Sequence, residues 1–190
     1  MAIRGTERNL AAEVLNRPAA RQGVKSIAID PERSESVTFD GLSFGSVGQY
    51  QKLRGIAYRE VDPLDPRNAV ITDIELAPVN AQGMVEYSMD IFILKPVDLN
   101  RGNHRILFDF NNRGQMRVGL FNDAVLTNNP TSIKHAGTGF IMNQGYTVVG
   151  SGWEPAVSGA DAMKITVPVV TKNGVAITGP SYEYIVFDND

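Results

Sequence analysis

The sequence predicts a β-rich α+β fold, and three observations support this class. From Val37 onward, short apolar runs rich in β-branched and aromatic residues alternate with Gly, Pro, Asn and Asp. Asn173-Gly174 separates two such runs, which is the pattern of a tight hairpin turn. Helical patterns are scarce, and the best candidate is the segment TGFIMNQG, which ends at Gly145.

The chain divides into a lead-in, residues 1–36, and a β-rich domain, residues 37–190. In the lead-in, Leu10, Val14 and Leu15 favour a short amphipathic helix that Pro18 ends, and the polar stretch DPERSES follows. We expect the lead-in to be loosely attached to the domain.

Eight strands are expected in the domain. The segment VEYSMDIFILKP shows the clearest alternation, because Val85, Tyr87 and Met89 are separated by polar residues, whereas its end is apolar on both sides. It is expected to start at a sheet edge and to run into a covered region. The expected strands are residues 36–40, 68–77, 85–96, 104–110, 146–152, 163–170, 175–179 and 182–187.

Two turns are predicted to close hairpins. Asn80 and Gly83 lie between the second and third expected strands and can supply a left-handed residue. Lys172-Asn173-Gly174 joins VPVVT to VAIT, and Asn-Gly at this position favours a two-residue turn.

The composition excludes several functional classes. The net charge of −3 comes without a basic cluster, so nucleic acid is not an expected partner. The absence of cysteine excludes thiol nucleophiles and thiolate metal sites, and His104 and His135 are too few for a three-histidine centre. No cofactor or metal is expected.

The N-terminus lacks the apolar centre of a signal peptide and no stretch is long enough to span a bilayer, so we expect a cytoplasmic protein, or an exported one whose signal was removed.

The string GLSFG matches the G-x-S-x-G nucleophile elbow, with Ser43 as the nucleophile and His135 as its base. A true elbow follows an apolar strand and opens a helix. Here SVTFD is half polar, and the ten residues after the string hold further glycines. A glycine-rich surface loop is therefore the favoured interpretation of Ser43.

Other chemistry-bearing residues have ordinary structural interpretations. Asp62, Asp65, Asn68 and Asp73 suggest calcium, but their spacing departs from the calcium-binding loop and favours a structural turn. His104 is expected at a solvated strand end and His135 at a helix cap or exposed. Trp153 is expected to pack, with lining of a pocket as the alternative.

The stretch HRILFDFNNRGQ ends an apolar strand in a polar loop. A strand, loop, helix and strand follow one another here, and ligands of α/β sheets bind at the carboxyl ends of the strands. Backbone N–H groups of Arg113, Gly114 and Gln115 are candidates for an oxyanion hole. Asn112 or the Arg113 side chain is a candidate for binding substrate oxygens. A plain polar turn is the alternative.

Residues from about Phe44 to Trp153 resemble the N-terminal part of a family of bacterial α/β-hydrolase domain proteins, most of them uncharacterised. The resemblance is strongest in VDPLDPRNAV, HRILFDFNNRGQ and NQGYTVVGSGWEP. It implies that HRILFDF and GYTVVGSGW are the third and fourth strands of a hydrolase sheet. It also implies that the loop at Asn112, Arg113 and Gly114 contributes an oxyanion-hole donor.

The resemblance further implies a serine hydrolase acting on a small-molecule ester or acyl substrate, whose serine elbow, acid and histidine follow later than residue 190. The chain would then hold the first strands of the sheet with additional β-hairpins and lack the catalytic half. An unfinished sheet predicts self-association or a complementing chain. The alternatives are a self-contained, non-catalytic β-rich binding module and a compact esterase that uses Ser43 and His135.

Overall fold

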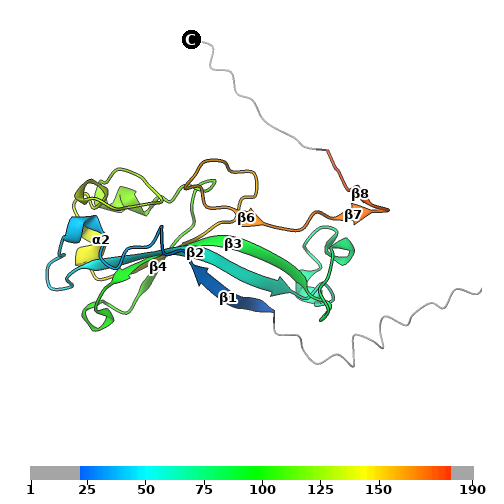
Figure 1. Ribbon diagram of the computed structural model, residues 1–190, viewed down its shortest axis with the longest axis horizontal. Helices are drawn as coiled ribbons and strands as arrows, with labels where there is room; N and C mark the ends of the chain where they lie inside the picture. The colour runs from blue at the N-terminus through cyan, green and yellow to red at the C-terminus, as the bar shows by residue number, and fades with distance from the viewer. Residues whose placement is uncertain (1–21, 181–190) are drawn as a thin grey trace, which may run out of the picture.

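The computed structural model describes residues 22–180, and its centre is a mixed six-stranded sheet with the order β1-β2-β3-β5-β4 (Figure 1). The sixth strand, β6, pairs with part of β3. A separate hairpin of β7 and β8 projects beyond the sheet. The strands are β1 (Gly23–Ile29), β2 (Tyr50–Val61), β3 (Val85–Pro96), β4 (Ile106–Asp109), β5 (Thr147–Ser151), β6 (Ile165–Thr166), β7 (Thr171–Lys172) and β8 (Val175–Ala176).

The helical segments are short. One α-helix is described, α2 (Phe140–Asn143), at the position predicted from TGFIMNQG, and Gly145 has the left-handed φ of 75° expected after a helix end. The 3₁₀ segments are η1 (Phe39–Gly41), η2 (Pro66–Asn68), η3 (Ile74–Leu76), η4 (Leu99–Arg101), η5 (Val118–Asn122) and η6 (Ile133–His135). Within residues 22–180 no helix has the length and apolar character needed to cross a membrane.

The β-rich fold class and several local predictions are confirmed. The strand at 85–96 is observed with the predicted bounds. Its first three residues pair with β2 alone, whereas residues 91–94 pair with both β2 and β5, as expected of a strand that starts at an edge and runs into a covered region. The turn at Asn173-Gly174 joins β7 to β8, and both residues have positive φ, as a type I′ turn requires. Strands are also observed within the ranges 104–110, 146–152, 163–170 and 175–179.

Four sequence predictions need correction. Residues 36–40 are not a strand, because Phe39 and Asp40 have left-handed backbone angles. Residues 68–77 form turns and 3₁₀ segments, so the turn at Asn80 leads into β3 without closing the predicted hairpin. No strand was predicted at residues 50–61, where β2 pairs antiparallel with the whole length of β3. The sheet begins at β1, inside the expected lead-in, whereas the expected strand 182–187 and the expected helix near Leu10 lie outside the described residues.

One face of the sheet packs against the irregular segments and α2. Phe92 and Leu94 of β3 and Val148 of β5 form its centre, and they contact a buried cluster from the segments that follow β1 and β4. Burial raises the pKa of Tyr50, whose hydroxyl lies 3.1 Å from the Met142 carbonyl oxygen and 3.0 Å from that of Tyr146. The cluster consists of Phe39, Phe44, Val47, Tyr50, Phe92, Leu94, Met116, Ala136, Ile141, Met142, Val148 and Met163.

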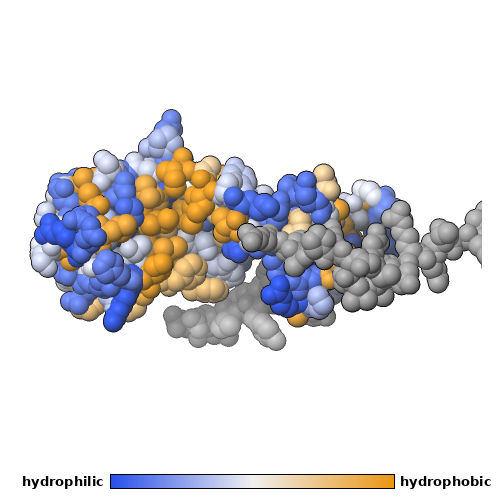
Figure 2. Space-filling view, turned by 90° about the horizontal axis from the view of Figure 1, so that it is seen from below, coloured by the Kyte–Doolittle hydropathy of each residue, from blue (hydrophilic) through white to orange (hydrophobic). Residues whose placement is uncertain are grey.

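The opposite face of the sheet, here called the open face, is also apolar. Leu53 pairs with Ile93, Ile93 with Val149, and Val149 with Phe108. Paired residues point to the same side, so these four side chains form a row across four strands. At its β4 end the row is exposed, because Phe108 is 52% accessible and its neighbours Ile106 and Phe110 are more so. Figure 2 shows hydrophobic residues gathered on the molecular face seen from below.

Candidate functional site

The predicted oxyanion loop is a tight turn at the carboxyl end of β4. Asn112 and Gln115 exchange two backbone hydrogen bonds, of 2.9 and 3.1 Å. The two central residues, Arg113 and Gly114, have φ angles of 47° and 81°. Two consecutive left-handed residues between paired flanks define a type I′ β-turn. Strand β4 is therefore followed by a two-residue hairpin turn that reverses the chain.

Asn111 anchors this turn to the sheet. It is almost fully buried, and its amide Nδ2 donates to the Ser151 carbonyl at the end of β5, at 2.7 Å. Its Oδ1 accepts the N–H of Gly114 at 2.9 Å, and its backbone carbonyl accepts the indole N–H of Trp153 at 2.8 Å. One side chain thus ties the ends of two parallel strands and the turn together.

The predicted backbone donors differ in their availability. The N–H of Gly114 is used by Asn111, and that of Gln115 donates to Asn112 within the turn. Among the described residues, the Arg113 N–H has no hydrogen-bond partner, and the Arg113 and Asn112 side chains are exposed. A role for Asn112, Arg113 and Gly114 in an oxyanion hole stays a prediction, and Arg113 is the residue of the three whose backbone donor is unoccupied.

A polar cavity of about 300 Å³ lies beside the turn. Segments from three parts of the chain line it: the turn itself, the residues before Pro130, and the loop between β5 and β6. Asn128 holds these segments together, because its Nδ2 donates to the carbonyls of Gly114 and Asp161 and its Oδ1 accepts the Met116 N–H. The lining residues are Arg113, Gly114, Gln115, Leu126, Thr127, Asn128, Ser158, Gly159, Asp161 and Ala162.

A buried arginine balances the one carboxylate of this cavity. Arg54 on β2 is 2% exposed, and its Nη1 lies 2.5 Å from Oδ1 of Asp161. Its Nη2 also donates to the Asp161 backbone carbonyl at 3.3 Å. The Asp161 side chain is 46% exposed, so the carboxylate faces the cavity on one side and the buried guanidinium on the other.

Sequence reasoning missed Asp109, Asn128 and Asp161. Asp109 is buried at the end of β4 and accepts the backbone N–H groups of Arg117 and Val118. A charged residue inside the apolar run ILFDF was a usable signal for Asp109, because buried carboxylates need fixed donors. Asn128 and Asp161 lie in loops without a periodic pattern, and nothing local in the sequence connects them to the turn.

Ser43 lacks the structural context of a nucleophile elbow. It is exposed and lies between η1 and β2, so neither an apolar strand precedes it nor a helix follows it. Within the described residues no hydrogen bond joins it to His135. The His135 Nδ1 instead accepts the backbone N–H groups of Thr131 and Ser132 at 3.1 and 3.2 Å, which is a capping role at η6.

The remaining candidates have structural roles. His104 is exposed just before β4, and Trp153 stacks on Phe110 with 5.7 Å between the ring centroids. In the acidic run, Asp65 caps η2 by accepting the Arg67 N–H at 2.9 Å. Across residues 22–180 no group of three or more His, Cys, Asp or Glu is placed to hold a metal ion.

The carboxyl group of Asp65 is expected to make the stability of the fold depend on pH in the acidic range. The hydrogen bond from the Arg67 side chain is the main cause that lowers the Asp65 pKa to about 2. A depressed folded pKa stabilises the fold above the unfolded value of about 4, and this stabilisation is lost as the pH falls toward 2. We expect Asp65→Asn to reduce the loss of stability between pH 4 and pH 2, measured by thermal unfolding. Parallel pH profiles of the wild-type and variant chains would contradict this.

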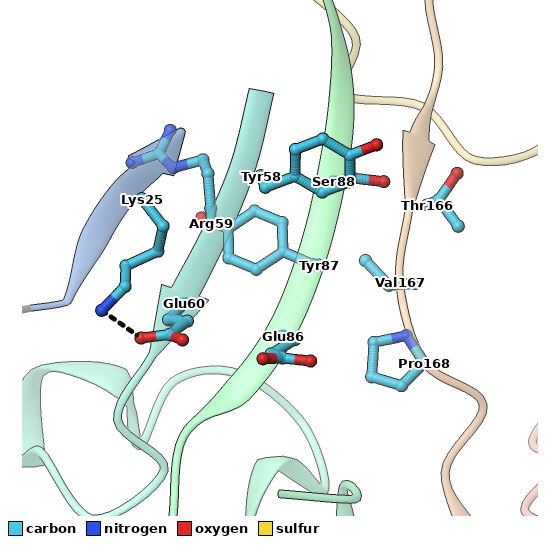
Figure 3. Close-up of a pocket in the computed structure, with 10 residues that line it drawn as sticks. All are labelled: Lys25, Tyr58, Arg59, Glu60, Glu86, Tyr87, Ser88, Thr166, Val167 and Pro168. Atoms are coloured by element: carbon cyan, nitrogen blue, oxygen red, sulfur yellow. Dashed lines mark ion pairs between the residues drawn. The ribbon is translucent and has the colours of Figure 1, made fainter. Parts of the chain in front are cut away.

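A second cavity, of about 400 Å³, lies between β2, β3 and the segment after β6 (Figure 3). Glu60 and Glu86 stand directly opposite each other, an unfavourable pairing that Asn80 relieves by donating Nδ2 to both. Lys25 pairs with Glu60 at 2.8 Å, and the Arg59 guanidinium lies over the Tyr87 ring. Tyrosine, serine and threonine hydroxyls complete a lining of mixed donors and acceptors.

Comparisons with protein-family models, with curated proteins and with solved structures found no match.

Proposed function

We propose that this chain is the N-terminal portion of a serine-hydrolase-like α/β protein that acts on ester or acyl substrates. In this proposal it supplies the first strands of the sheet and the loop at Arg113, and the nucleophile follows residue 190. The supporting observation is the unit formed by β4, the type I′ turn, α2 and β5. Its two strands are parallel neighbours, and the polar cavity lies beside the turn at the carboxyl end of β4.

The edge of the sheet at β4 and its exposed open face also support the proposal. Strand β4 has β5 on one side and no strand on the other among the described residues. Parallel strands are normally covered on both faces, whereas the open face around Phe108 is exposed. A further strand beside β4 and helices over the open face would satisfy both the backbone groups and the apolar side chains.

The test has two parts. The coding sequence that follows codon 190 is expected to continue in frame into an apolar strand and a G-x-S-x-G motif. The purified 190-residue chain is expected to take up no fluorophosphonate serine probe, with mass spectrometry used to locate any modified peptide. Label on Ser43 that disappears in Ser43→Ala would contradict the proposal and favour the compact esterase.

The alternative is a self-contained β-rich binding module, and the cavity beside Tyr58 and Tyr87 is the observation that favours it. Its lining offers aromatic rings, hydroxyls and balanced charges, which suits a polar ligand of no net charge. A stop codon directly after codon 190, together with a monomeric chain at high concentration, would favour this module over the hydrolase portion.

A further inference from the structure

Arg113 occupies a backbone position that rarely takes arginine. The first central residue of a type I′ turn needs positive φ, and glycine, asparagine and aspartate are the residues that usually supply it. Arg113 is held there at φ 47° by the paired flanks Asn112 and Gln115. Strained backbone positions cluster at ligand sites, where the surrounding structure fixes a side chain that function requires.

The turn is fixed against the wall of the polar cavity. A Cβ on Gly114 would lie 3.1 Å from the Met163 carbonyl oxygen and 3.1 Å from the Val157 side chain, so the turn packs closely on the loop between β5 and β6. The Met163 N–H also donates to the Gly114 carbonyl at 3.0 Å. The turn that carries Arg113 is therefore held at a fixed position against the loop between β5 and β6, which lines the same cavity.

Of the two charged side chains that line this cavity, only the carboxylate has an ion-pair partner within residues 22–180. The cavity is lined by one cation, Arg113, and one carboxylate, Asp161. The Asp161 charge is already matched from behind by Arg54. Arg113 has no ion pair or hydrogen bond among the described residues, so the lining carries an uncompensated positive charge beside the hydroxyls of Thr127 and Ser158.

We propose that Arg113 binds the carboxylate of a small organic acid in this cavity. A planar guanidinium suits a carboxylate because two parallel N–H groups can meet its two oxygens. For its catalytic role, this binding site rests on the proposed function. Within that function, the substrates would be esters that also carry a free carboxylate.

The test is a titration of ¹⁵N-labelled chain, followed by NMR, with monomethyl succinate and with dimethyl succinate, its neutral counterpart. We expect saturable shifts at the amides of Arg113, Gly114, Ser158 and Gly159 with the monoester only. Arg113→Gly should weaken binding at least tenfold and raise the melting temperature, because glycine adopts the left-handed conformation freely. Loss of binding in a more stable variant cannot be attributed to misfolding.

Two further variants separate the effect of the bidentate guanidinium geometry from the effect of its positive charge. Arg113→Lys keeps the charge without the bidentate geometry, and we expect it to bind several-fold more weakly than the wild type. Arg117→Ala removes an equal charge nearby but outside the cavity lining, and its binding should be unchanged. Equal weakening by Arg113→Gly and Arg117→Ala, equal binding of the diester, or no saturable shift would overturn the proposal.

These outcomes are distinct from those of the proposed function. No carboxylate binding, combined with an in-frame G-x-S-x-G downstream, would overturn the role of Arg113 and leave the hydrolase proposal standing. Selective carboxylate binding with a stop codon after codon 190 would support the Arg113 site and contradict the hydrolase portion.

Discussion

Phe92→Ala is expected to lower the free energy of unfolding by about 3–5 kcal/mol, the usual cost of removing a buried phenylalanine. Phe92 is 2% exposed and belongs to the buried cluster between the sheet and α2. The neighbouring segments that cover it would have to collapse into the space that the ring leaves. Urea denaturation monitored by circular dichroism measures the change.

Phe108→Ala is the matched control, because it removes the same side chain from the open face. Phe108 is 52% exposed, so its truncation should cost less than about 1 kcal/mol. Both variants are compared at a protein concentration at which the wild-type chain is monomeric. Similar destabilisation by both would then mean that the monomer itself covers its open face, in contradiction to the proposed unfinished sheet.

Asp161→Asn is expected to lower the free energy of unfolding by about 2 kcal/mol. Arg54 would remain buried in the core without a counter-charge, and breaking a fully buried pair costs about 3–5 kcal/mol. The value expected here is lower because the Asp161 side chain is half exposed and water can approach the pair. Denaturant titration at neutral pH measures it.

The double variant Arg54→Met and Asp161→Asn tests whether the unpaired charge of Arg54 causes this destabilisation. Without the buried charge, the chain should recover much of the lost stability, since apolar replacement of a buried ion pair is often neutral. An Asp161→Asn variant as stable as the wild type would show that Arg54 is not held by Asp161. The shape of the cavity beside Arg113 would then need another explanation.

Local patterns predicted part of this fold well. The alternation of Val85, Tyr87 and Met89 identified β3, and Asn173-Gly174 identified the small hairpin, because in both cases neighbouring residues contain the whole signal. The strand β2 was missed because Lys52 and Arg54 occupy its buried face. These buried charges depend on Glu35, Asn129 and Asp161, partners far away in the sequence.

Other predictions failed because apolar composition was taken for burial. Val70 and Ile71 suggested a strand, yet both are exposed in turns between η2 and η3. At the site, the polar turn at Arg113 was found from the sequence, since a strand that ends in Asn-Asn-Arg-Gly is a local pattern. The cavity beside it was not predictable, because Asn128 and Asp161 meet the turn only through tertiary contacts.

Sedimentation velocity of the wild-type chain and Phe108→Lys, over a range of protein concentrations, tests the central claim most directly. The wild-type chain is expected to self-associate as its concentration rises, because the open face is exposed and one side of β4 has no neighbouring strand among residues 22–180. Phe108→Lys should remain monomeric and folded. A wild-type chain that stays monomeric at the highest concentration, with the sedimentation coefficient of the variant, would contradict an unfinished sheet.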